Sequence, residues 1–283
     1  MKYKYVNKIS KNIKLCPSKK SLNILKGKYK KLINEQDLVI GSLKDYNTND
    51  DIRNINWKAS AKYQKLLVNK YISKNNHNIK IILDPSYLMN AHTDNNETKR
   101  IVAIYIAATI GTISINNNDK LNMIIDRENI PINSLYELDI NLQKYEMNIS
   151  RITTINNSLS YILDNPKKKA FIFILTDIKS IDNLNIKIIK KLSTYNNILI
   201  VNINDHNLSN KNLIDINTNK YIPKIFINNK KLLKEEHNIK NKIIKNKRKQ
   251  LSKYKIPIIS ISSVSEINTK LIKLLEEFKY ARF

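Results

Sequence analysis

The chain has 283 residues, 42% of them hydrophobic, and 50 Lys and Arg against 24 Asp and Glu give it a formal net charge of +26. This length suits one large domain, alone or with a small N-terminal part, and recurrent apolar runs exclude a wholly disordered chain. The single cysteine, Cys16, excludes an internal disulfide and a thiol-rich metal site. The four histidines lie far apart without an i, i+4 pair, which argues against a histidine zinc site.

The positive charge has two interpretations. It is typical of proteins that bind nucleic acid or an anionic membrane surface. The chain is also rich in Lys, Asn and Ile, with 3 Gly and 6 Pro, and an AT-rich coding sequence would produce this bias. With so few glycines, no glycine-rich phosphate loop can be built. The basic residues are scattered along the chain and aromatic residues do not interleave with them, which favours the compositional interpretation.

The sequence gives no sign of a secretion signal or a membrane span. Residues 1–20 contain many lysines and lack the apolar core of a signal peptide. The longest uncharged run, residues 101–115, is shorter than the roughly 20 apolar residues that a membrane-spanning helix needs. We therefore expect a cytoplasmic protein with no transmembrane segment, whose charge could hold it at the periphery of a membrane.

The N-terminal part shows little periodicity. Residues 1–44 have mixed polarity and are predicted to form an irregular N-terminal segment, with a small β module as the alternative. Residues 45–56 are dense in Asp and Asn, which is typical of a turn region. Residues 57–71 then lead towards the first clear strand.

From residue 76 onwards, short apolar runs alternate with segments of helical length. Strands are predicted at residues 79–83, 121–125, 170–175, 198–203 and 256–261. Helices are predicted at residues 97–113, 132–145, 154–163, 182–195, 232–254 and 264–280. This alternation is typical of βαβ units, in which helices cover both faces of a parallel sheet. The sequence therefore predicts an α/β domain over residues 76–283.

Two acidic residues come directly after predicted strands. Asp84 follows the strand at residues 79–83, and Asp177 follows the strand at residues 170–175. Ligands of parallel α/β sheets bind beyond the carboxyl ends of the strands. We therefore expect these two side chains to lie side by side at one rim of the sheet.

Residues 45–62, DYNTNDDIRNINWKASAK, carry a family resemblance. The segment resembles the signature of the bacterial domain-of-unknown-function family 58, in which Gly-Asp-Asp precedes Arg and the pattern Ile-x-Trp-Lys-x-Ser-Ala-Arg. Asn49 replaces the usual glycine and Lys62 the usual arginine. We take residues 45–75 as the family signature region. The matching residues of greatest interest are Asp50, Asp51, Arg53, Trp57, Lys58 and Ser60.

A second segment, IILDPSYL at residues 81–88, resembles the first strand of a von Willebrand factor A-like domain and its Asp-x-Ser-x-Ser loop. Arg248, Leu251 and residues 256–262 are similar to the family's tail, so the resemblance covers about residues 40–283. It implies a von Willebrand factor A-like (Rossmann-like) α/β fold, with a central, mostly parallel sheet flanked by helices.

The same resemblance implies a divalent-cation site, for which Mg²⁺ suits the oxygen ligands. Its ligand positions match Asp84, Ser86, Thr153 and Asp177, whereas Leu88 replaces a ligand serine. We therefore expect weak Mg²⁺ binding at most. In the alternative interpretation the two aspartates cap turns or helices after the strands, and Ser86 and Thr153 hydrogen-bond local backbone.

The charged residues of the signature region also have two interpretations. Asp50, Asp51, Arg53 and Lys58 could form a recognition surface or a catalytic carboxylate pair. They could equally form a turn, in which the carboxylates pair with Arg53 and Lys58 and Trp57 anchors the segment in the core. No nucleophile or histidine lies nearby in sequence to complete a catalytic set, so we assign no catalytic residue.

The densest basic stretch, KNKIIKNKRK at residues 240–249, has apolar residues at helical spacing. This pattern favours a docked amphipathic helix with a solvated lysine face, and a contact site for RNA, DNA or anionic lipid is the alternative. The predicted apolar face consists of Ile239, Ile243, Ile244 and Leu251.

The family resemblance implies a non-catalytic adaptor that acts with a MoxR-type AAA+ ATPase in the assembly or maturation of other proteins. Under this hypothesis residues 84–88 and Asp177 face the partner. The second hypothesis is a basic protein that binds nucleic acid or an anionic membrane surface. A third, a metal-dependent hydrolase that uses Asp84 and Asp177, lacks an evident general base.

Overall fold

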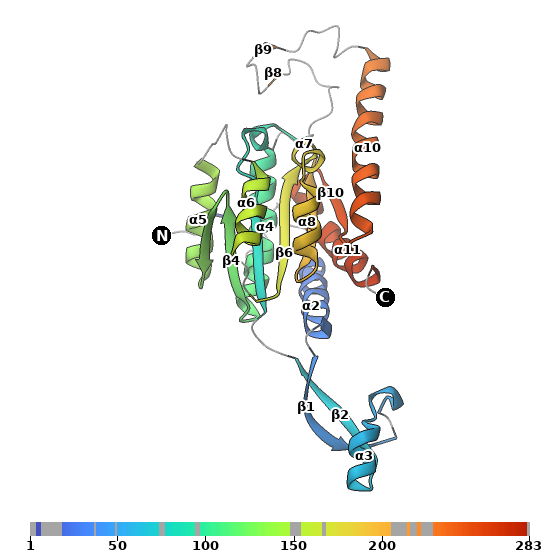
Figure 1. Cartoon of the computed structure of the whole chain (residues 1–283). Helices are drawn as coiled ribbons and strands as arrows, with labels where there is room; N and C mark the ends of the chain where they lie inside the picture. The colour runs from blue at the N-terminus through green and yellow to red at the C-terminus, as the bar shows by residue number, and fades with distance from the viewer. Residues whose placement is uncertain are drawn as a thin grey trace.

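The computed structural model describes residues 4–6, 19–36, 38–48, 50–73, 77–93, 97–147, 154–165, 168–204, 214–215, 220–221 and 229–281. Its centre is a six-stranded sheet with the spatial order β10-β7-β6-β3-β4-β5 (Figure 1). All neighbouring strands are parallel except β5, which runs antiparallel to β4 at one edge. The strands are β3 (Asn78–Leu83), β4 (Lys120–Ile125), β5 (Glu128–Ile132), β6 (Ala170–Asp177), β7 (Asn197–Ile203) and β10 (Ile258–Ile261).

The strand order has a topological switch point between β3 and β6. Numbered along the chain within this sheet, the strands lie in the order 6-5-4-1-2-3, which is the order of Rossmann-like doubly wound folds. The chain moves outward from β3 through β4 to one edge, and from β6 through β7 to the other. Connections on either side of the β3–β6 pair therefore diverge, and such a point is where these folds bind ligands.

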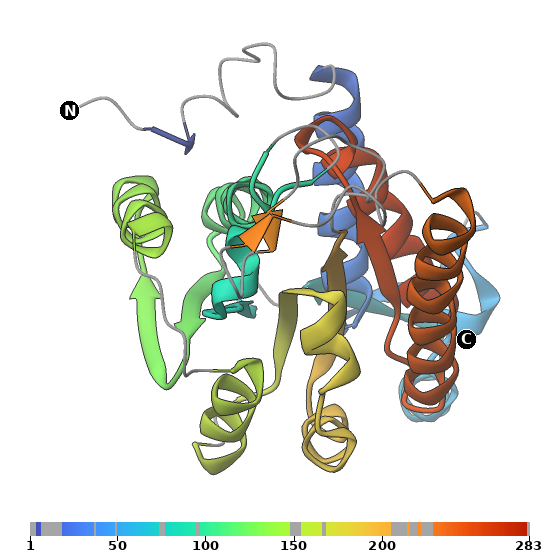
Figure 2. The same ribbon diagram turned by 90° about the horizontal axis from the view of Figure 1, so that it is seen from above.

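Helices cover both faces of the sheet, as the view from above shows (Figure 2). On one face α2, α4, α5 and α11 enclose a core with Ile79, Ile81 and Leu83 of β3. On the other face α6, α7, α8 and the end of α10 enclose a second core with Ile82. The helices are α2 (Lys19–Gln36), α4 (Lys99–Asn116), α5 (Leu135–Met147), α6 (Ile155–Asp164), α7 (Ile178–Asp182), α8 (Ile186–Ser193), α10 (Lys230–Ser252) and α11 (Ile267–Tyr280).

Burial on both faces explains why the strands were recognisable in the sequence. All eight residues of β6, AFIFILTD, are buried, and so are all seven of β7. A strand covered on both faces needs apolar side chains at every position and not only at alternate ones. Helix α4 is buried almost throughout, including Lys99 and Arg100 in its first turn. In the described part of the chain no helix combines the length and hydropathy needed to cross a membrane.

The family signature region forms a small module that projects from the α/β domain (Figure 1). Strands β1 (Leu38–Asp45) and β2 (Leu67–Ser73) pair antiparallel, with an irregularity between Ile40 and Ser42. Between them lie the 3-10 turn η1 (Ile52–Asn54) and helix α3 (Trp57–Tyr63). The hydrogen bond from Asn56 N to Leu67 O ties this connection back to β2.

The structure corrects the prediction of an irregular segment over residues 1–44. Helix α2 occupies residues 19–36 and packs against α11, where Lys28 pairs with Glu276. The Tyr29 hydroxyl is buried 2.8 Å from Ser114 Oγ of α4. Strand β1 begins at Leu38, so the predicted boundary at residue 44 falls within a strand. The lysine-rich composition of α2 conceals an apolar stripe that includes Leu25 and Tyr29, both fully buried.

Smaller differences concern the connections. The helix predicted at residues 132–145 begins at Leu135, because residues 128–132 form the antiparallel strand β5. The helix predicted at residues 182–195 is the shorter α8, which Asn185 caps, and α7, which the sequence did not predict, precedes it. Short turns η2 (Tyr87–Asn90) and η3 (Val264–Glu266) and the small pair β8 (Ile214–Asp215) and β9 (Lys220–Tyr221) complete the described elements.

Candidate functional site at the carboxyl rim of the sheet

Asp84 and Asp177 meet at the switch point, as the sequence predicted. Strands β3 and β6 are parallel neighbours in register from Asn78 opposite Ala170 to Leu83 opposite Leu175. The amide of Asp84 extends this pairing with a 3.1 Å hydrogen bond to Leu175 O. The two acidic side chains therefore emerge from adjacent strands at the same rim, and both residues are buried.

Both carboxylate oxygens of Asp84 are engaged by its own chain. Oδ1 accepts a 2.9 Å hydrogen bond from the Ser86 amide, and Oδ2 accepts one from the Thr176 hydroxyl. The Asp84 carbonyl accepts a 2.6 Å bond from the Tyr145 hydroxyl of α5. Burial raises the pKa of Asp84, and the neighbouring Asp177 charge adds to the rise, against hydrogen bonds that lower it. Asp84 thus fixes the loop that follows β3.

Asp177 is held by a helix and by a buried cation. Its Oδ1 accepts a 2.8 Å hydrogen bond from the Ser180 amide and so caps α7. Its Oδ2 lies 2.9 Å from Lys99 Nζ, and both side chains of this ion pair are 2% exposed. Burial acts to raise the pKa of Asp177, but the Lys99 charge and the hydrogen bonds outweigh it, so the pKa is lowered. Capping by Asp177 is what the alternative interpretation of this residue predicted.

Arg100, next to Lys99 at the start of α4, gathers three segments around the rim. Its Nε donates to Asn90 Oδ1 at 2.8 Å, and its two terminal nitrogens donate to Tyr145 O at 2.9 Å and to Ser86 O at 3.3 Å. These bonds connect the loop after β3 with the end of α5. A guanidinium suits this role, because its planar array of donors reaches several acceptors at once.

The described residues do not fit the Mg²⁺ site that the family resemblance implied. Each carboxylate oxygen of Asp84 and Asp177 already has a protein donor, and the cation beside Asp177 is Lys99. Leu88 is apolar and half-buried, and Thr153 lies outside the described residues. Ser86 Oγ is buried without a hydrogen-bond partner among the described residues, so the expected local backbone bond is wrong. Within the described ranges no group of three or more His, Cys, Asp or Glu could hold a metal.

The signature residues form the projecting module, away from the rim. Asp51 pairs with Arg53 at 2.8 Å, as predicted, but Asp50 pairs with Lys44 and not with Lys58. Ser60 is buried and accepts a 2.9 Å bond from the Leu67 amide, which fixes α3 on β2. The prediction that Trp57 anchors the segment in the core is wrong, because Trp57 is 65% exposed.

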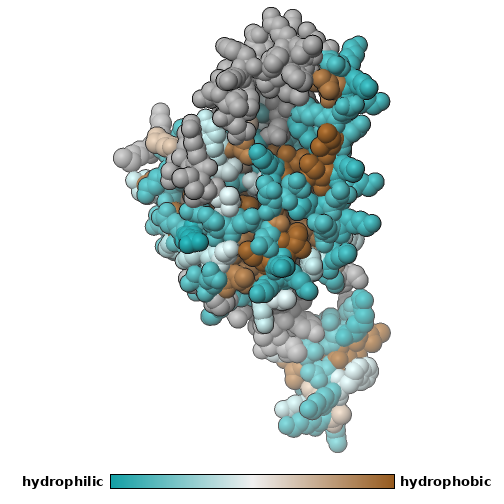
Figure 3. Space-filling model, turned by 45° about the horizontal axis from the view of Figure 1, so that its top comes forward, coloured by the Kyte–Doolittle hydropathy of each residue, from teal (hydrophilic) through white to brown (hydrophobic). Residues whose placement is uncertain are grey.

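Helix α10 presents most of its basic residues to solvent. It contains nine Lys or Arg and two Glu, and its end packs on the core through buried Leu251. Ile244 also packs on the core, but Ile239 is 59% exposed, so the predicted apolar face docks only in its C-terminal part. Hydrophobic patches show beside α10 on an otherwise hydrophilic surface (Figure 3). The exposed basic residues are Lys230, Lys231, Lys234, Lys242, Lys245, Arg248 and Lys249.

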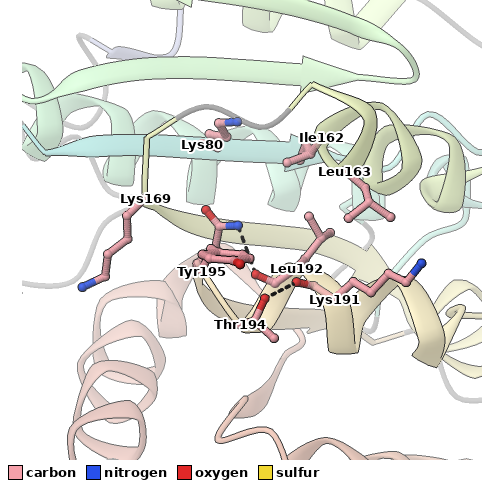
Figure 4. Close-up of a pocket in the computed structure, with 9 residues that line it drawn as sticks. Lys80, Ile162, Leu163, Lys169, Lys191, Leu192, Thr194 and Tyr195 are labelled. Carbon is pink, nitrogen blue, oxygen red and sulfur yellow. Dashed lines mark hydrogen bonds between the residues drawn. The ribbon is translucent and has the colours of Figure 1, made fainter.

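A hollow of about 510 Å³ lies at the opposite, amino edge of the sheet, between the ends of α6 and α8. Lys80 of β3, Lys169 before β6 and Lys191 of α8 surround it (Figure 4). Hydrogen bonds from Asn196 Nδ2 to Leu192 O and from Thr194 Oγ1 to Lys191 O shape its wall. The hollow is separate from the carboxyl rim.

The sequence interpretation missed Lys99, Arg100, Tyr145 and Thr176 as rim residues. In the sequence, Lys99 and Arg100 are two charges at the start of a helix that is otherwise apolar. In the structure they are buried with that helix, at 1% and 2% exposure. A charge inside a buried element requires a partner, which is the signal that could have pointed to Asp177. Tyr145 and Thr176 had no comparable signal in the sequence.

Comparison with known proteins places the chain in a family. The family model described as "Protein of unknown function DUF58" matches residues 42–219, from the projecting module to beyond β7. Because this match covers more than half of the 283 residues, the chain belongs to the DUF58 family. The match includes the signature region, Asp84 and Asp177, whereas the resemblance inferred for residues 220–283 lies outside it. No curated protein matches the chain.

Proposed function

We propose that this chain is a von Willebrand factor A-like, non-catalytic adaptor, whose carboxyl rim binds a protein partner. The partner proposed on the family resemblance is a MoxR-type AAA+ ATPase, and the proposed outcome is assembly or maturation of other proteins. The rim residues concerned are 84–88 and Asp177, which caps α7. In the same proposal the protein works in the cytoplasm, either free or attached to a membrane surface.

The supporting observation is that the acidic pair at the switch point holds the rim in place. Asp84 and Asp177 are 0% and 1% exposed, and their carboxylates bind the Ser86 amide, Thr176, the Ser180 amide and Lys99. A carboxylate that acts on a substrate must reach it within hydrogen-bond distance, directly or through one water. Both carboxylates here serve backbone and side chains of the chain itself. A rigid surface at a switch point favours recognition over hydrolysis.

The test is co-purification of a AAA+ ATPase with the tagged full chain from cells that naturally contain it, followed by mass spectrometry. Leu88→Glu places a charge on the half-exposed rim loop and should abolish recovery of the ATPase. Ile239→Glu is the matched control, because it introduces the same charge at an exposed apolar position on α10. Melting temperatures of both variants establish that they are folded.

Two results would contradict the adaptor proposal. One is the consistent absence of any AAA+ ATPase from the recovered proteins. The other is equal recovery with the wild type and Leu88→Glu, which would place the contact elsewhere. Repeating the experiment in EDTA and in Mg²⁺ shows whether the contact needs a divalent ion.

A second candidate function is supported by α10, whose exposed basic residues would suit a polyanion such as RNA, DNA or an anionic membrane surface. Fluorescence anisotropy with labelled DNA, and sedimentation with anionic vesicles, should then show binding that weakens as salt rises. The triple variant Lys242→Gln, Lys245→Gln, Lys249→Gln should reduce it, whereas Lys187→Gln, Lys190→Gln, Lys191→Gln on α8, at exposed positions, is a control of equal charge. Equal loss in both triple variants would indicate net charge and not a site.

A further inference from the structure

The carboxyl rim contains four buried charged side chains, two acidic and two basic. Asp84 and Asp177 are 0% and 1% exposed, and Lys99 and Arg100 are 1% and 2% exposed. Burying an unpaired charge is costly, so such groups are found with a counter-charge or a metal. In this rim the positive charges come from the chain itself, at the first two positions of α4.

Lys99 contacts Asp177 directly. Its Nζ lies 2.9 Å from Asp177 Oδ2, with both side chains 2% exposed. Lys99 is placed there by its helix, since Thr98 caps α4 through the Ile101 amide and the Lys99 amide donates to Ala91 O. An ammonium group on a fixed helix end is therefore held against the carboxylate that ends β6.

We propose that Lys99 is a tethered internal cation of the carboxyl rim, which assembles this rim without a metal ion. The Lys99 ammonium balances the Asp177 carboxylate, and Arg100, the next residue of α4, adds a second buried positive charge that would repel a divalent ion. Mg²⁺ also needs close to six oxygen ligands in octahedral array. The described rim supplies apolar Leu88 and carboxylate oxygens that already accept hydrogen bonds.

Removal of the Lys99 ammonium frees Asp177 Oδ2 and removes the charge that would repel a divalent ion. The other carboxylate oxygens keep a lone pair beside the hydrogen bond that each accepts. The Ser86 hydroxyl is buried without a partner among the described residues, and it belongs to the residue whose amide binds Asp84 Oδ1. Carboxylates, a hydroxyl and waters are a ligand set that Mg²⁺ accepts. Lys99→Ala should therefore acquire a dependence on Mg²⁺ that the wild type lacks.

The experiment measures the melting temperature of the full chain in EDTA, in millimolar Mg²⁺ and in K⁺ of matched ionic strength. The wild type should melt at one temperature in all three. Lys99→Ala should melt about 10 °C lower in EDTA, because it leaves a buried carboxylate without its counter-charge. Mg²⁺, and not K⁺, should restore several degrees by binding the folded state.

The double variant Lys99→Ala, Asp177→Asn is the matched control. It has the same cavity but lacks the second charge, so Mg²⁺ should restore nothing. A rise in the melting temperature of the wild type with Mg²⁺ would overturn the inference, and so would a folded Lys99→Ala whose melting temperature does not change with Mg²⁺.

If Lys99→Ala does not fold, a titration of the wild type with Mn²⁺, followed by electron paramagnetic resonance, tests the inference instead. If all the added Mn²⁺ stays free in solution, the result supports Lys99 as the internal cation. If the protein binds Mn²⁺, the inference is overturned. Because no partner is involved, this test can fail while the adaptor proposal stands.

Discussion

The guanidinium of Arg100 lies over the ring of Tyr145, with Arg100 Cζ 4.6 Å from the ring centroid. The same guanidinium donates to the Tyr145 carbonyl at 2.9 Å, and the Tyr145 hydroxyl donates to the Asp84 carbonyl at 2.6 Å. Tyr145 therefore links the first turn of α4 with the end of β3. Burial raises the pKa of Tyr145, so the hydroxyl stays protonated and remains a donor at neutral pH.

Replacement of Tyr145 by Phe removes only this hydroxyl and should destabilise the fold. The Asp84 carbonyl would lose a buried donor, which costs about 1–3 kcal/mol in free energy of unfolding. Urea unfolding at neutral pH measures the change. Tyr280→Phe is the control, because Tyr280 is 77% exposed and loss of its hydroxyl should change stability by less than about 0.5 kcal/mol. Equal effects of the two substitutions would show that the Tyr145 hydroxyl has no structural role.

The two rim aspartates should respond to pH in opposite directions. Asp177 has a pKa below its ordinary 3.8 in the folded state, so its contribution to stability is present above that value and is lost as pH falls through the folded pKa. Asp84 has a pKa above 3.8 in the folded state. Its contribution is full below that value and is lost as pH rises through the folded pKa.

Urea unfolding of Asp84→Asn and Asp177→Asn, from a pH below the ordinary aspartate value of 3.8 up to neutral pH, tests these signs. The loss caused by Asp177→Asn should grow as pH rises to about 3.8 and stay constant above it, because the variant has no carboxylate to pair with Lys99. The loss caused by Asp84→Asn should instead shrink towards neutral pH, because the wild type then carries the cost of a buried carboxylate. Either slope is at most about 1.4 kcal/mol per pH unit for one proton. Parallel slopes for the two variants would contradict the assignment.

The sheet and the placement of its acidic pair could be predicted because burial on both faces constrains the sequence directly. A run such as AFIFIL in β6 predicts a buried strand. Because β3 and β6 are parallel neighbours, their ends bring Asp84 and Asp177 to one rim. The antiparallel strand β5 was not predicted because its five residues, ENIPI, include a single fully buried one, Ile132. A strand at an edge needs fewer apolar residues.

The site itself could be predicted only in part, because its contacts join distant parts of the chain. The partner of Asp177 is Lys99, 78 residues away, and only the folded sheet brings α4 beside the end of β6. In the signature region, the predicted burial of Trp57 was wrong for a different reason. Tryptophan is usually placed inside, but the hairpin module of β1 and β2 is too small to enclose Trp57. Its anchor is instead the short side chain of Ser60.

Trp57 gives a direct optical test of this correction, because it is the chain's single tryptophan. At 65% exposure it should be quenched by acrylamide in the native protein more than half as strongly as in the urea-unfolded chain. The control is the double variant Trp57→Phe, Phe171→Trp, which moves the fluorophore to a position in β6 that is 3% exposed and should be well shielded. Native quenching as weak as that of the control would mean that Trp57 is covered.

Two glycines in helices form a matched pair for the packing of α4. A methyl group added at Gly27 of α2 meets no atom within 4 Å, whereas one added at Gly111 of α4 would lie 2.7 Å from Leu138 Cδ2 and 3.2 Å from Leu121 Cδ2. Alanine is preferred to glycine inside a helix by about 0.8–1 kcal/mol. Gly27→Ala should therefore raise the free energy of unfolding by about that amount.

Gly111→Ala should have the opposite effect. Leu138 is 0% exposed and Leu121 is 3% exposed, so neither side chain can move aside without disturbing the core between α4, α5 and β4. Overpacking costs about 1–3 kcal/mol, which exceeds the gain in helix propensity. Urea unfolding of the two single variants and of the double variant measures both terms, which should add because the sites share no partner. Stabilisation by both substitutions would show that α4 lies further from α5 than the close approach at Gly111 requires.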